Sequence, residues 1–310
     1  MIINDKEITP GTERVIKVGI SKLPSHTSID ILLTVFQSLE PGPVLLLLGG
    51  MHGDEINGIE IVRRIIDSNQ HKVLRGTTIC IPLMNIYGFI HFSRTLPDGK
   101  DVNRSFPGNK NGSLASRMAD YLVKDIIPKI DFGIDFHTGG AQRTNYPQTR
   151  CVMKDKENQI LAAAFNAPFA LNSNFRPNSL RWTASKMGKK ILVYEGGESV
   201  RFDEFAINEG INGTLRVMKH LNMIDEAPLA NHICKEVTNS SWIRSDKAGL
   251  FNSLVQSGEY IKKNQIVGQL TDPFGEFKKH VKTKVEGFVI GLNNNPLLHQ
   301  GDAIMHIGVV

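Results

Sequence analysis

The sequence predicts an α/β fold, a mixed and mostly parallel sheet flanked by helices, followed by a small all-β domain. Two observations carry this prediction. Strand-like and helix-like segments alternate up to about residue 225, as in parallel α/β sheets. Beyond that point only short β-like runs occur, separated by Gly and Asn. With 310 residues, 41% hydrophobic and 22% charged, the chain has the length and composition of a globular protein with more than one domain.

Two β-like runs, Val15–Ile20 and Ile29–Phe36, follow a Pro10-Gly11 turn and predict an antiparallel entry to the sheet. Four apolar runs then predict strands at Val44–Leu48, Thr77–Leu83, Asp131–Phe136 and Lys190–Tyr194. The predicted helices are Gly58–Ser68, Ser113–Ile127, Gln159–Phe165 and Ile207–Leu221.

A change of pattern near residue 225 predicts a domain boundary. Asp225-Glu226-Ala227-Pro228 has the composition of a linker. The β-like runs after it are Ala248–Leu254, Ile266–Leu270, Gly287–Leu292 and Ala303–Val309. We therefore expect one domain at 1–225 and a small all-β domain at 235–310, close to the lower size limit for a stable core.

Charge and cysteine usage exclude several classes of protein. The net charge is +5, and the densest basic stretch, between Lys278 and Lys284, is typical of a solvated strand face, so no nucleic-acid partner is expected. The three cysteines are scattered, which favours a reduced, cytoplasmic setting. Neither a signal peptide nor an apolar run of membrane-spanning length is evident. Exposed β edges would allow a homo-oligomer.

Three residues predict a metal site. His52 and Glu55 lie in a turn directly after Val44–Leu48, and His137 follows Ile130–Phe136. The carboxyl ends of neighbouring parallel strands lie at one edge of a sheet, where ligands bind. Two imidazoles and one carboxylate, with a fourth position for water, are typical of catalytic zinc. We therefore predict one Zn²⁺ per chain.

A Gly- and Pro-flanked loop, Asp101–Gly108, predicts an anion site. Arg104 can grip a carboxylate with two hydrogen bonds, and Asn103 beside it can add a neutral donor. Asp101 could instead be structural and hold Arg104 in place.

Glu195 ends the apolar run Ile191–Tyr194, an unfavourable place for a charge without a partner or a purpose. A carboxylate beside a zinc ion can take a proton from water and return it to the leaving nitrogen. Glu195 is the predicted base, and Glu198 is its rival.

These motifs resemble the succinylglutamate desuccinylase/aspartoacylase branch of the zinc carboxypeptidase-like superfamily. The matching segments, in order, are Gly49–Glu55, Asp101–Gly108 and Asp135–Gly140. Residues 93–108 also resemble the N-acetyl-diaminobutyrate deacetylase-like members. The C-terminal segment resembles the barrel-sandwich domains of lipoyl and biotinyl carriers, but no Met-Lys attachment pair is present, so a carrier role is not expected.

The resemblance implies a zinc-carboxypeptidase-like fold. It also implies an enzyme that hydrolyses a small N-acyl amino acid to a carboxylic acid and a free amino acid. It implies that the two histidines and Glu55 hold zinc, that Asn103 and Arg104 bind the substrate carboxylate, and that Glu195 acts on water. Arg94 is a candidate to stabilise the oxyanion.

A tyrosine or second arginine often completes the pocket of such enzymes. The chain offers Tyr146, Arg143, Arg176 and Arg181, each expected to be ordinary surface. Tyr260 could reach the pocket only if the C-terminal domain caps it.

Two other functions remain open from the sequence. One is a metallocarboxypeptidase acting on peptide C-termini, and the other is a non-catalytic binding protein of the same fold. The acyl group (acetyl, succinyl or related) and the amino acid are also left open.

Overall fold

The computed structural model describes residues 1–310. Its strands are β1 (Ile2–Ile3), β2 (Lys6–Glu7), β3 (Thr12–Lys22), β4 (Ser28–Gln37), β5 (Glu40–Leu48), β6 (Arg75–Ile81), β7 (Phe132–Gly139), β8 (Arg143–Cys151), β9 (Phe169–Asn172), β10 (Lys190–Glu198), β11 (Lys235–Val237), β12 (Asn239–Arg244), β13 (Gly249–Ser253), β14 (Tyr260–Ile261), β15 (Ile266–Thr271), β16 (Lys278–Lys282), β17 (Gly287–Asn293), β18 (Leu297–Leu298) and β19 (Ala303–Val309). Its α-helices are α1 (Ile56–Asp67), α2 (Ile86–Ile90), α3 (Leu114–Tyr121), α4 (Lys156–Phe165), α5 (Leu180–Lys186) and α6 (Glu204–His220).

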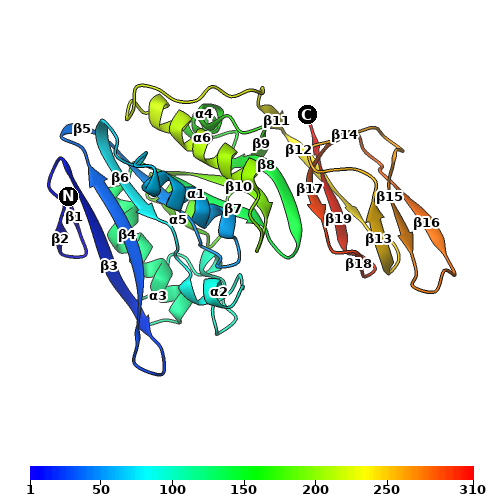
Figure 1. Ribbon diagram of the computed structural model, residues 1–310, viewed down its shortest axis with the longest axis horizontal. Helices are drawn as coiled ribbons and strands as arrows, with labels where there is room; N and C mark the ends of the chain where they lie inside the picture. Colours follow the sequence, from blue (N-terminus) through cyan, green and yellow to red (C-terminus); the bar gives the residue numbers. More distant parts are fainter.

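A sheet of thirteen strands forms the centre of the molecule (Figure 1). Its main path runs β3-β4-β6-β5-β7-β10-β8-β17-β19-β12. The pairs β6–β5, β5–β7 and β7–β10 are parallel, whereas β4–β6 and β10–β8 are antiparallel. The predicted α/β fold with a mixed sheet is confirmed, and the parallel run of the main path lies at its centre.

Helices cover both faces of the central strands, and β5 shows why. Leu45 and Leu47 pack into one hydrophobic layer with residues of α1, α4 and α6. Leu46 and Leu48 pack into the other layer, with residues of α3 and α5. Successive side chains of a strand point to opposite faces, so a strand covered on both sides must be apolar throughout.

Several predicted boundaries shift. The helix expected at Ser113–Ile127 ends as an α-helix at Tyr121 and continues as a π turn, Leu122–Ile126, and a 3-10 turn, Ile127–Lys129. Pro128 has no N–H to continue a regular helix. The strands predicted to end at Phe136 and Tyr194 run on to Gly139 and Glu198.

The C-terminal strands are joined to the central sheet. β17 pairs with β8, and β19 and β12 follow, so the sheet continues into the C-terminal segment, which Figure 1 shows in colours from yellow to red. A second sheet, β16-β15-β13-β18, covers a separate hydrophobic cluster that includes Phe251 and Ile304. The division at 1–225 and 235–310 stays a prediction. None of the helices combines the length and apolar character needed to cross a membrane.

Candidate functional site

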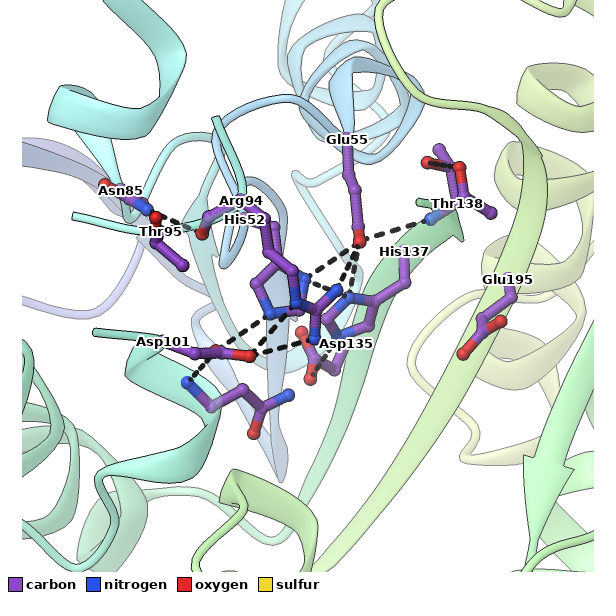
Figure 2. A network of polar contacts seen from close by, with 12 residues as sticks. His52, Glu55, Asn85, Arg94, Thr95, Asp101, Asp135, His137, Thr138 and Glu195 are labelled. Atoms are coloured by element: carbon purple, nitrogen blue, oxygen red, sulfur yellow. Dashed lines mark hydrogen bonds and ion pairs between the residues drawn. The ribbon is translucent and has the colours of Figure 1, made fainter. Parts of the chain in front are cut away.

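His52, Glu55 and His137 form one buried group, although 85 residues separate the two histidines. The Nδ1 atom of His52 lies 2.9 Å from Oε1 of Glu55, and Nδ1 of His137 lies 2.7 Å from Oε2. The two Nδ1 atoms are 3.2 Å apart. Figure 2 shows all three side chains directed toward one point. The three ligand atoms lie within 4.8 Å of one another, so this group could hold a metal ion.

The turn after β5 places His52 and Glu55. A β-carbon on Gly53 would lie 1.9 Å from the backbone nitrogen of Phe89, so only glycine fits at position 53. Leu48 at the end of β5 pairs with Asp135 of β7, two residues before His137. The sequence placed His137 just beyond its strand. It lies instead within β7, because the strand continues through Thr138 and Gly139.

Each histidine has a carboxylate on its other ring nitrogen. Asp101 Oδ1 lies 3.1 Å from Nε2 of His52, and Asp135 Oδ2 lies 2.9 Å from Nε2 of His137. Such partners hold the proton on Nε2 and leave Nδ1 free to bind a metal ion. Asp135 was not identified from the sequence, although the period of two along β7 puts it on the same face as His137.

The charges of this group oppose the cost of burial. Burial alone would lower the pKa of His137, but the neighbouring carboxylates of Asp135 and Glu55 raise it well above its usual value. For Glu55, burial would raise the pKa, but the two histidines hold it well below its usual value. Glu55 is therefore a carboxylate, and protons compete with a metal ion for the histidines.

The Asp101–Gly108 loop contributes three side chains to the site. Asp101 forms ion pairs with His52 and with Arg94, at 3.1 and 3.0 Å, and has no ion pair with Arg104. It still holds the turn that carries Arg104, because its carboxylate accepts a hydrogen bond from the Asn103 N–H at 2.8 Å and its carbonyl oxygen accepts one from the Arg104 N–H at 3.1 Å. Arg94 also lies 3.1 Å from Oε1 of Glu55. Asn103 accepts a hydrogen bond from the Leu180 N–H at 2.9 Å, which ties this loop to the start of α5.

A cavity of about 650 Å³ opens over the group. Arg94, Asn103, Arg104 and Glu195 line it together with the three ligand residues. Five further residues of the wall come from segments that sequence reasoning treated as surface or did not single out: Arg143, Asn145, Arg150, Arg176 and Arg181. The prediction that Arg143, Arg176 and Arg181 are ordinary surface is wrong.

The arginines of this wall differ in their partners. Arg94 and Arg150 form ion pairs with carboxylates, and Arg181 donates to the carbonyl oxygens of Arg150, Ser173 and Asn174. Arg104, Arg143 and Arg176 have no carboxylate within 4.0 Å; these three are called the unpaired arginines below. Neither Tyr146 nor Tyr260 lines the cavity; Trp242 of β12 is the residue that the C-terminal strands contribute.

Glu195 lies beside the ligand group without touching it. In the sheet it is the direct neighbour of His137, and Figure 2 shows its carboxylate apart from the three ligand side chains. One carboxylate oxygen, Oε2, accepts a hydrogen bond from Asn145 at 2.5 Å and forms an ion pair with Arg150 at 2.7 Å. Its rival Glu198 bonds to Asn294 and does not line the cavity.

Comparisons with known proteins agree on one family. Residues 41–221 match the model of the succinylglutamate desuccinylase/aspartoacylase catalytic domain. The chain is 30% identical over 274 residues to N-alpha-acetyl-L-2,4-diaminobutyric acid deacetylase of Halomonas elongata, covering 82% of this chain and 79% of the relative.

Solved structures share the fold along almost the whole chain. The product-bound ectoine utilization protein EutE (DoeB) of Ruegeria pomeroyi superposes with a TM-score of 0.85 at 24% identity, covering 98% and 97% of the two chains. A succinylglutamate desuccinylase/aspartoacylase of Rhodobacter sphaeroides gives 0.84 at 23%, covering 96% of each. The family-model match and the Halomonas relative show that this chain belongs to the succinylglutamate desuccinylase/aspartoacylase family.

Proposed function

We propose that this protein is a zinc-dependent deacylase that hydrolyses the amide bond of a small N-acyl amino acid and releases a carboxylic acid and a free amino acid. The observation that carries the proposal is the buried His52–Glu55–His137 group in the wall of a cavity that also holds Glu195 and the arginines. The activity named for the Halomonas relative, deacetylation of an N-acetyl amino acid, supports the same reaction class.

The donor set fits zinc. Two imidazole nitrogens and a carboxylate are one of the usual ligand sets of catalytic zinc, and carboxylate partners on the far ring nitrogens accompany such sites. Asp101 and Asp135 are those partners here. A zinc ion in this place would polarise an amide carbonyl and make water more acidic.

Glu195 has the position of the base in such a reaction. It faces the same cavity as the ligand group, one strand away from His137, and its second oxygen, Oε1, has no protein partner. That oxygen can accept a proton from water and return it to the departing nitrogen. Arg94, fixed between Glu55 and Asp101, can donate a hydrogen bond to the oxygen of the scissile carbonyl.

The unpaired arginines favour a substrate that carries a carboxylate. Burial and the positive charges of Arg176 and Arg94 lower the pKa of Arg104, while Asp101 and Glu55 oppose this shift. A bound anion would offset the cost of burying the Arg104 charge and its repulsion from the other two arginines. Arg104 and the free amide nitrogen of Asn103 can bind the carboxylate of the amino-acid part. The cavity volume, about 650 Å³, is within the range of small-molecule sites.

The decisive experiment is a screen of N-acyl amino acids for release of free amine, with the zinc-loaded protein and with chelator-treated protein. We expect release that the chelator abolishes and zinc restores. Release from peptides but not from N-acyl amino acids would favour the carboxypeptidase alternative, and protein purified natively without bound zinc would favour a binding protein.

Two matched variants test the base. Glu195→Gln keeps the shape of the side chain, and we expect zinc to stay bound while turnover falls by a factor of about 10² to 10⁴. Glu198→Gln is the control on the same strand, and its turnover should stay near that of the unmodified protein. Near-normal turnover of Glu195→Gln would exclude Glu195 as the base.

A further inference from the structure

We propose that Asn145 and Arg150 are positioning residues that hold Glu195 in the orientation needed for proton transfer. The proposal rests on the proposed hydrolase function and adds two residues to it. Both residues come from β8, the strand next to β10, and both side chains end at the same carboxylate oxygen.

The two contacts give the two oxygens of the Glu195 carboxylate different roles. Oε2 receives the Asn145 amide at 2.5 Å and the Arg150 guanidinium at 2.7 Å. Oε1 receives no hydrogen bond from the protein and remains for water or substrate. A glutamate side chain has three rotatable bonds, so one hydrogen bond and one ion pair on the same oxygen restrict where the other oxygen can point. Restricting a catalytic group in this way lowers the entropic part of a reaction barrier.

An irregularity in β8 makes this arrangement possible. Residues 145 and 150 are five apart, so in a regular strand their side chains would point to opposite faces of the sheet. Arg150 pairs with Val193 and Gln148 with Glu195, but Asn145 pairs with Gly197. Three residues of β8 therefore face two of β10, and the shift returns Asn145 to the face of Arg150. Bulges next to active sites commonly redirect a side chain in this way.

The C-terminal strands support the position of Asn145. Gly291 of β17 pairs with Asn145 on one side and with His306 of β19 on the other. A β-carbon on Gly291 would lie 3.1 Å from Oδ1 of Asn145 and 3.3 Å from Cβ of His306, so a larger residue would press on both. His306 in turn stacks on Trp242, with ring centroids 4.2 Å apart, and Trp242 is part of the cavity wall. These contacts connect the C-terminal strands to Asn145 and, through Asn145, to the orientation of Glu195.

The test compares kcat and KM of zinc-loaded Asn145→Ala, Asn145→Asp, Arg150→Met and Arg150→Lys. We expect kcat to fall by up to about 100-fold in Asn145→Ala and Arg150→Met, with KM and zinc content almost unchanged. Arg150→Lys keeps a donor and should recover part of the rate. Asn145→Asp keeps the shape but places a second carboxylate beside Glu195, so it should be at least as slow as Asn145→Ala. Asn294→Ala removes a similar amide from Glu198 and serves as the control.

A double-mutant cycle separates positioning from a general structural effect. In the Glu195→Gln background, Asn145→Ala should lower kcat no further, because the group that it orients no longer transfers protons. An equal further loss in that background would overturn the proposal, and so would a change confined to KM, which would make Arg150 a substrate-binding residue. Absence of hydrolysis by the unmodified protein would instead refute the proposed function. A structure of Asn145→Ala with Glu195 unmoved would contradict positioning by Asn145 whether or not the protein is active.

Discussion

The two sides of the cavity differ in how completely the protein satisfies its own charges. On the metal side, His52 and His137 each contact Glu55 and a second carboxylate, so each polar group already has partners. Elsewhere in the cavity wall, the unpaired arginines Arg104, Arg143 and Arg176, called the arginine side below, have no carboxylate partner. The first side is built to hold a cation without help from the substrate. The arginine side obtains a partner of opposite charge only when an anion enters the cavity, so it contributes to substrate specificity.

Removing a ligand from the metal side should have the largest effect. We expect His137→Ala to lose bound zinc and essentially all hydrolysis, because two ligands remain where three are needed. Asp135→Asn keeps the ligand and changes only its partner, so zinc affinity or activity should fall by about 10- to 100-fold. Metal content by atomic absorption, together with the rate, measures both. If His137→Ala retained a full equivalent of zinc, the proposed ligand set would be wrong.

Removing an arginine from the arginine side should change substrate binding rather than metal binding. We expect Arg104→Ala to keep its zinc and to raise KM by about 10- to 100-fold, the loss expected for a charged hydrogen-bonded pair. Arg201→Ala is the control, because Arg201 is 76% exposed and lies outside the cavity wall. An unchanged KM for N-acyl amino acids in Arg104→Ala would reject the carboxylate clamp.

The metal side could be predicted because local sequence placed its residues. His52 and Glu55 lie in the turn after the apolar run Val44–Leu48, and a buried strand of that kind ends at the ligand-binding edge of an α/β sheet. The same reasoning predicted Glu195 at the end of the apolar run Ile191–Tyr194, and in the structure it pairs with His137 across β10 and β7.

Of the arginine side, only Arg104 could be predicted, from its Gly- and Pro-flanked loop. β8 has the sequence Arg-Thr-Asn-Tyr-Pro-Gln-Thr-Arg-Cys, with a central proline and no regular apolar alternation, so it does not have the pattern of a strand. A shift in its pairing then decides which side chains reach the cavity. Trp242 arrives from a strand about 100 residues further along, and only the tertiary pairing of β17 with β8 brings it there.

The smallest expected effect tests how far the positive charge of the arginine side extends. His306 stacks on Trp242; burial and the charge of Arg150 lower its pKa to about 4, whereas His137 on the metal side has a raised pKa. Between pH 6.5 and about 4 the unfolded chain binds a proton at this position and the folded chain does not, so acidification favours unfolding. His306 therefore does not lower the free energy of unfolding above pH 6.5, but it lowers this free energy progressively as the pH falls from 6.5 toward 4.

The change His306→Gln should remove this pH dependence. Between pH 7 and pH 5 the unmodified protein should lose up to about 2 kcal/mol more unfolding free energy than His306→Gln loses. Urea unfolding of both proteins at the two pH values measures it, and the metal ligands titrate alike in both, so their contribution cancels. His220→Gln, at an exposed position, is the control. If the difference stayed constant between the two pH values, His306 would not be held neutral by its surroundings, and the influence of the arginines would end at the cavity wall.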